Sequence, residues 1–99
     1  MTSVHFTRDR QDRENLIKEI GSGKVVKRVV VDRGHRNGPE IHEVTDNAIV
    51  NIYNQRTGKL ITKLIARPNQ IKRYYEEGKA PKEILNKAYD HMKKGYNER

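Results

Sequence analysis

The sequence predicts an α+β fold in which one helix precedes a four-stranded antiparallel sheet and two helices follow it. Three features of the sequence predict this class. Apolar residues recur at helical spacing near both ends of the chain, β-branched runs occupy its middle, and glycine or proline separates these runs. The chain has 99 residues, which corresponds to a single small domain over 1–99.

The first helix is expected over residues 7–20. A threonine begins this stretch, good helix formers follow, and the apolar residues Leu16, Ile17 and Ile20 fall on one face. The GSGK segment that comes next ends the helix, because its two glycines permit a left-handed cap and a hinge. Residues 25–32 are β-branched and too short for a helix, so we expect them to form the first strand.

Three more strands are expected over 40–45, 47–54 and 59–67. The first of them alternates polar and apolar residues, as a half-buried strand does. A hairpin joins the last two, and Gly58 in it is free to adopt a positive φ. Consecutive strands with short connections most simply form an antiparallel meander.

The last two helices are expected over 68–78 and 81–97. Pro68 and Pro81 suit the first position of a helix, since proline lacks the N–H that a helix start leaves unpaired. Gly78 ends the shorter helix. The longer helix carries one apolar stripe that would pack on the sheet.

The composition favours a partner with negative charge. Lysine and arginine number 21 against 13 acidic residues, which gives a formal net charge of +8. A field of this sign attracts polyanions, with nucleic acid first among them and acidic proteins second. There is no cysteine for a disulfide or a thiolate metal site, no export signal at the start, and no apolar run long enough to span a membrane. We therefore expect no cofactor, no metal and no membrane partner.

The segment DRGHRNGPEIHEVTDN, residues 32–47, is the strongest candidate for an active site. It places His35 in a glycine-flanked turn and His42 on a strand, where Glu40 or Glu43 could orient the ring. A sheet surface that combines histidine with Asn, Tyr, Lys and Arg side chains is suited to cleaving a phosphodiester without metal, with a base for the ribose 2′-hydroxyl and cations for the phosphate. The same pattern also fits an ordinary solvated sheet face.

A second candidate site follows the last strand. Arg67 ends that strand just before the helix that Pro68 begins, and the N–H groups at a helix start favour anions. Lys72, Arg73 and Tyr74 follow, and such a basic and aromatic cluster can hold phosphates and stack bases. Equally, the tyrosine could simply pack the helix against the sheet.

The stretch EIHEVTDNAIVNIYNQRTGKLITKLIARPNQIKRYY, residues 40–75, resembles the C-terminal toxin domains of bacterial polymorphic and contact-dependent toxins. The helix-then-four-strand order and the basic charge resemble, more narrowly, the ribonuclease superfamily of barnase, EndoU, the anticodon-cleaving colicins and RelE. The resemblance covers roughly residues 5–92. It implies a metal-independent ribonuclease that leaves a 2′,3′-cyclic phosphate, often on tRNA, and that an acidic cognate immunity protein neutralises. It also implies delivery at the end of a longer carrier and action in the cytoplasm of a target cell.

These expectations combine into one hypothesis and two alternatives. The leading hypothesis is an endoribonuclease whose catalytic residues are His42, His35, Thr45, Lys63 and Arg67. Its RNA contacts would be Arg33, Arg36, Thr62, Gln70, Lys72, Arg73 and Tyr74. One alternative is a nucleic-acid-binding module without catalysis. The other is a metal-dependent nuclease, because DRGH, residues 32–35, matches the signature of large non-specific endonucleases.

Overall fold

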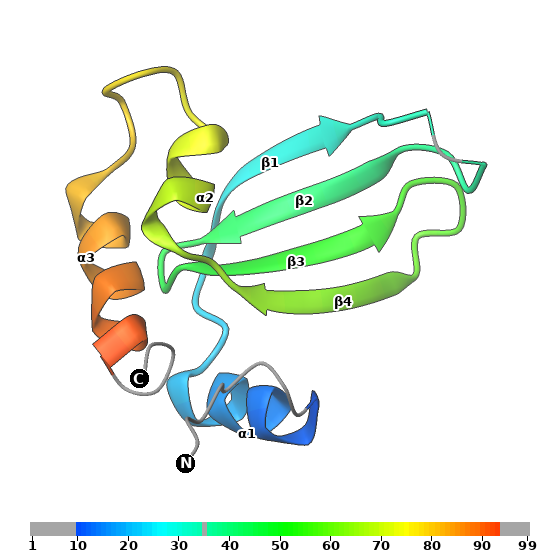
Figure 1. Ribbon diagram of the computed structural model, residues 1–99. Helices are drawn as coiled ribbons and strands as arrows, with labels where there is room; N and C mark the ends of the chain where they lie inside the picture. Colours follow the sequence, from blue (N-terminus) through cyan, green and yellow to red (C-terminus); the bar gives the residue numbers. More distant parts are fainter. Residues whose placement is uncertain (1–9, 35, 94–99) are drawn as a thin grey trace, which may run out of the picture.

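The computed structural model describes residues 10–34 and 36–93 and has the predicted α+β fold (Figure 1). One helix, a four-stranded sheet and two further helices follow one another along the chain. They are α1 (Arg10–Ile20), β1 (Val25–Val31), β2 (Glu40–Thr45), β3 (Ile49–Asn54), β4 (Leu60–Ile65), α2 (Pro68–Arg73) and α3 (Lys82–His91). The strands are antiparallel and adjacent in sequence order, which confirms the predicted meander. The predicted first three residues of α1 and last four of α3 lie outside the described residues.

The pairing register decides which side chains share a face of the sheet. His42 of β2 lies opposite Ile52 of β3, and Ile52 lies opposite Thr62 of β4. Side chains alternate along a strand, so the neighbours Asn51 and Lys63, themselves a cross-strand pair, point to the other face. We name the first surface the His42 face and the second the Lys63 face.

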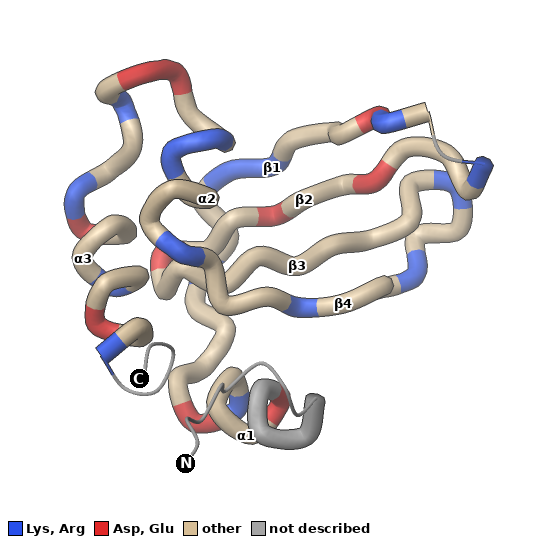
Figure 2. The backbone as a smooth tube through the Cα atoms, in the orientation of Figure 1, with Lys and Arg blue, Asp and Glu red and all other residues tan. Residues whose placement is uncertain are grey.

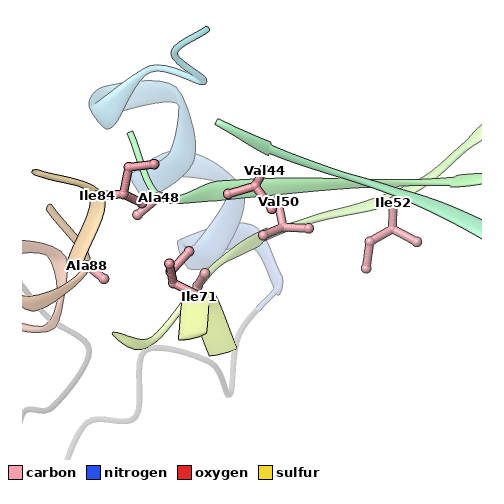
Figure 3. Close-up of a cluster of buried hydrophobic side chains, with 8 residues drawn as sticks. Val44, Ala48, Val50, Ile52, Ile71, Ile84 and Ala88 are labelled. Atoms are coloured by element: carbon pink, nitrogen blue, oxygen red, sulfur yellow. The ribbon is translucent and has the colours of Figure 1, made fainter. Parts of the chain in front are cut away.

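Helices α2 and α3 cover the His42 face. Val44 and Val50 of the sheet form one buried cluster with Ile71 of α2 and with Ile84 and Ala88 of α3 (Figure 3). All of these side chains are at most 3% exposed. Because each fully buried aliphatic side chain stabilises a fold by roughly 1.5–3 kcal/mol, this cluster holds both C-terminal helices on the sheet.

Helix α1 packs on the Lys63 face. Ile17 contacts Ile49 and Ile65, which are buried at the end of the sheet where β4 leads to α2. The helices therefore sandwich one end of the sheet, while Val30, Leu60 and Ile61 toward the other end remain about half exposed. A domain of this size has a small core, and here that core is confined to the sandwiched end of the sheet.

The turn between β2 and β3 ties the three layers together. Thr45 Oγ1 accepts the backbone N–H groups of Asn47 (3.3 Å) and Ile49 (3.1 Å). Asn47 Nδ2 donates to the carbonyls of Ile20 (3.0 Å) and Gly21 (2.6 Å), where α1 ends, and the Asn47 carbonyl lies 2.8 Å from His91 Nε2 at the end of α3. These bonds satisfy backbone groups that burial would otherwise leave unpaired.

Helix α2 is shorter than predicted, because it ends at Arg73 and not near Gly78. The N–H groups of Tyr74 and Tyr75 bond to the carbonyls three residues earlier, those of Ile71 and Lys72, which tightens the last turn. Gly78 does have a positive φ of 77°, but it lies in a later turn. The early end of the helix leaves Tyr74 beside His42 on β2.

Candidate functional site

The register of the sheet divides the residues that sequence reasoning placed on one reactive surface. His42 lies on the face that α2 and α3 cover, whereas Asn51, Tyr53 and Lys63 lie on the opposite face. The expectation that histidine, asparagine, tyrosine and lysine side chains share one surface of the sheet is therefore wrong. Neighbouring residues of a strand point to opposite faces, so a shift of one residue in the pairing exchanges the two faces. Which side chains share a face therefore depends on the register of β2, β3 and β4.

A hydrogen-bonded chain of three side chains is centred on His42. Its Nε2 lies 2.9 Å from Glu40 Oε1, and its Nδ1 lies 2.6 Å from the hydroxyl of Tyr74. Glu40 and His42 are two residues apart on β2 and thus share a face, while Tyr74 reaches them from the end of α2. The rings of His42 and Tyr74 also contact each other, with centroids 5.6 Å apart.

The partners of His42 determine its tautomer. A carboxylate accepts hydrogen bonds and does not donate them, so Nε2–H donates to Glu40, and in the neutral ring Nδ1 then accepts the Tyr74 O–H. With 2% of its surface exposed, His42 presents neither ring nitrogen directly to a substrate. The arrangement instead gives Tyr74 a base for its hydroxyl proton and gives that base an orienting carboxylate.

Tyr74 lies among further groups that sequence reasoning singled out. Burial raises the pKa of its phenol, while a side-chain hydrogen bond from Gln70 and the positive charge of Arg33 lower that pKa in part. The carboxylate of Glu40 raises the pKa of the phenol, and the positive charge of Arg73 lowers it by a smaller amount. The phenol is therefore protonated at neutral pH, with two guanidinium groups near enough to influence it. Glu40, His42 and Tyr74 are therefore joined by hydrogen bonds, while Gln70, Arg33 and Arg73 influence the Tyr74 phenol.

The raised pKa of Tyr74 predicts a specific loss of stability in alkali. In the folded protein the phenol keeps its proton at a pH where a tyrosine of the unfolded chain, with a pKa of about 10, has lost it. The unfolded state then binds fewer protons, so the free energy of unfolding falls as pH rises above about 10. Tyr74→Phe should make this fall less steep in urea denaturation, and Tyr89→Phe, at an exposed site, should leave it unchanged. If the free energy of unfolding fell equally steeply with pH in the parent and in both variants, the raised pKa would not belong to Tyr74.

Two of the residues predicted to be catalytic lie elsewhere and have other partners. Thr45 is fully buried, and its hydroxyl holds the β2–β3 turn, so it is not available to a substrate. Lys63 is on the opposite face, where its Nζ donates to Ser22 Oγ at 2.9 Å. Arg67 precedes α2, whose first residue is Pro68 as predicted. His35, the second predicted histidine, lies outside the described residues.

The other predicted RNA contacts lie on β4, on α2 and in the connection between β1 and β2. Thr62 pairs with Ile52 at the edge strand, and Lys72 is an exposed residue of α2. Arg36 is exposed in the β1–β2 connection, where its carbonyl accepts a 3.4 Å bond from Arg56 of the β3–β4 hairpin. In the part of the chain that the structure describes, lysine and arginine lie on all three helices, on β1 and β4 and in both of these connections, whereas β2 and β3 carry none (Figure 2). The positive charge is therefore spread over the helices, the two edge strands and these connections, where it favours the approach of a polyanion.

Sequence reasoning named both Glu40 and Glu43 as possible partners of His42, and the structure selects Glu40. Glu43 lies on the other face, where Arg28 binds it at 2.7 Å. The contact between His42 and Tyr74, 32 positions apart, was not foreseen. No sequence spacing indicates it, because it depends on where α2 returns over the sheet.

The described residues form no metal centre, and the comparisons with known proteins found no relative. In the part of the chain that the structure describes, no three histidine or acidic side chains are placed to hold a metal ion. None of its helices within 10–34 and 36–93 has the length and apolar character needed to cross a membrane. The chain matches no family model, no curated protein and no solved structure.

Proposed function

We propose that this domain is a metal-independent endoribonuclease that cleaves RNA by attack of a ribose 2′-hydroxyl on the adjacent phosphate. The observation that carries the proposal is the chain Glu40, His42, Tyr74, in which hydrogen bonds of 2.9 and 2.6 Å join a carboxylate, an imidazole and a phenol. Arg33 and Arg73 lie close enough to influence the phenol, and the net charge of +8 attracts RNA.

In this mechanism Tyr74 touches the substrate and His42 acts through it. The 2′-hydroxyl gives its proton to the Tyr74 oxygen as the Tyr74 proton moves to His42 Nδ1. The 2′-oxygen bonds to phosphorus, the bond from phosphorus to the 5′-oxygen breaks, and water protonates the departing oxygen. The products are a 2′,3′-cyclic phosphate and a 5′-hydroxyl, and the imidazolium returns its proton to solvent by way of Tyr74.

The remaining groups of the site stabilise charge during this step. Glu40 stabilises the imidazolium that forms on His42, because its carboxylate already accepts the Nε2–H. Arg33 and Arg73 supply guanidinium groups for the negative charge that develops on the phosphate oxygens. Gln70 donates to the Tyr74 oxygen and positions the phenol. No metal ion is required in this scheme.

One observation favours a second function, that of an RNA-binding module without catalysis. Both nitrogens of His42 are hydrogen-bonded and the side chain is nearly inaccessible, so the same three residues would fasten α2 to the sheet. The basic surface and Tyr74 would then bind phosphates and stack a base. Cleavage assays separate the two functions, because a module binds RNA and leaves it intact.

A ribonuclease of this kind needs an inhibitor in the cell that makes it. We propose an acidic immunity protein as its protein partner, since the net charge of +8 favours association with a surface of opposite charge. The resemblance to toxin domains supports delivery at the end of a carrier and action on RNA, including tRNA, in the target cytoplasm.

The purified domain should degrade RNA in excess EDTA and leave duplex DNA intact. The physical reason is that each group in the scheme is a protein side chain, and duplex DNA lacks the 2′-hydroxyl that attacks. Gel analysis of labelled RNA and DNA, with the 3′ ends of the fragments mapped, checks this. Activity that EDTA abolishes and Mg²⁺ restores would favour the metal-dependent alternative, and RNA binding without cleavage would favour the module.

A further inference from the structure

A groove lies on the Lys63 face, between α1 and the edge strand β4. Its volume is about 560 Å³, which is ample for one nucleotide. The residues that line it come from α1, from the glycine-rich hinge and from β4: Glu14, Ile17, Lys18, Gly21, Ser22, Leu60, Ile61, Thr62 and Lys63. The chain Glu40, His42, Tyr74 is on the opposite face of the sheet, so this groove is a separate feature.

One part of the groove is suited to an anion. Lys63 Nζ donates to Ser22 Oγ at 2.9 Å, which holds the half-buried ammonium in place. Since the serine oxygen accepts this bond, its own O–H remains available to donate, and the ammonium retains two further N–H groups. Among the described residues Lys63 forms no salt bridge. Lys18 brings a second positive charge to the lining against the single carboxylate of Glu14.

The adjoining part of the groove is apolar. Leu60 and Ile61 are each 48% exposed, and buried Ile17 lies beneath the same groove. Exposed aliphatic groups next to fixed cations suit a ligand that joins a flat, weakly polar ring to a phosphate. Such a ligand would remove the two β4 side chains from water while its phosphate meets the lysine.

Beside Lys63 lies an acceptor that no described residue satisfies. Asn51 is the cross-strand partner of Lys63, it is 7% exposed, and its Oδ1 is buried without a hydrogen-bond donor. Buried polar atoms are nearly always paired, so a donor from outside the described residues is expected at this position beside Lys63.

We infer that this groove binds one nucleotide of a single-stranded RNA, an inference whose choice of RNA rests on the proposed function. The phosphate contacts Lys63 Nζ and Ser22 Oγ, and the base covers Leu60 and Ile61. RNA would then contact both faces of the domain, with the Lys63 face positioning the strand. Uridine 5′-monophosphate tests this binding without any cleavage, because it contains no phosphodiester bond. The inference can therefore fail or hold independently of the proposed ribonuclease activity.

The experiment is an NMR titration of the whole domain with uridine 5′-monophosphate, with uridine and inorganic phosphate as separate probes. The nucleotide should shift the amides of Ser22, Ile61 and Lys63, and each fragment alone should bind more weakly. Lys63→Met should weaken nucleotide binding about 10-fold or more, since it removes the phosphate contact. Lys82→Met, the same charge change at an exposed position of α3, should alter it less than about twofold.

Other outcomes would overturn the inference. Equal weakening by Lys63→Met and Lys82→Met would mean that only general charge attracts the nucleotide. Shifts centred on Tyr74 in place of Ser22 would place nucleotide binding on the other face. Binding of inorganic phosphate as tight as that of the nucleotide would show that the apolar part of the groove contributes nothing. Melting temperatures of both variants, measured first, establish that each is folded.

Discussion

Tyr74→Phe is expected to lower the rate of RNA cleavage by about 10²-fold or more, because the hydroxyl it removes carries the proton of the 2′-hydroxyl to His42. The phenylalanine ring retains the packing of Tyr74 against the buried cluster. It leaves His42 Nδ1 without its donor, which costs about 1–3 kcal/mol of stability for a buried acceptor. The rate should therefore be measured well below the melting temperature of the variant.

Two further variants make this experiment decisive. Tyr89→Phe removes a phenol from an exposed position of α3 and should cleave RNA like the parent. Glu40→Gln keeps the size of the side chain and removes the negative charge beside Nε2, so cleavage should fall by about 10-fold and its pH profile should change. Full activity in Tyr74→Phe would remove this residue from the mechanism and leave the three-residue chain as a structural contact.

Ile71→Ala is expected to destabilise the domain by about 2–5 kcal/mol, which is a large part of the stability of so small a fold. Ile71 belongs to α2, is fully buried and packs in one cluster with Val44 and Val50 of the sheet. Its truncation leaves a cavity at the point where α2 is held in place. Because Tyr74 follows the same helix, the contact of Tyr74 with His42 should weaken as well. Urea denaturation of parent and variant gives the difference in free energy.

Ile61→Ala is the matched control for this substitution. It removes the same atoms from a side chain that is 48% exposed, so the free energy of unfolding should change by less than about 1 kcal/mol. If the two variants were equally stable, the cluster that joins α2 to the sheet would not be the core of the domain. A loss in Ile71→Ala with unchanged cleavage would show that the position of α2 does not matter to the site.

The sequence by itself determined the order and the type of the elements. Alternation and β-branching located β2 at 40–45, and the glycine-rich hinge and Pro68 marked where helices end and begin. These signals are local, because they reflect backbone preferences and hydrophobic periods within a few residues. Such signals also place Glu40 and His42 on one face, since the two residues lie on the same strand.

Only the tertiary structure decided which residues meet across elements. The register between strands separated His42 from Lys63, which had been expected on one surface, and the early end of α2 brought Tyr74 to His42 Nδ1. Thr45 shows the same limit, because the partners of its hydroxyl are backbone groups that only the closed turn presents. Strand register and the path of a helix depend on packing between segments far apart in the chain, and that packing has no counterpart in local sequence.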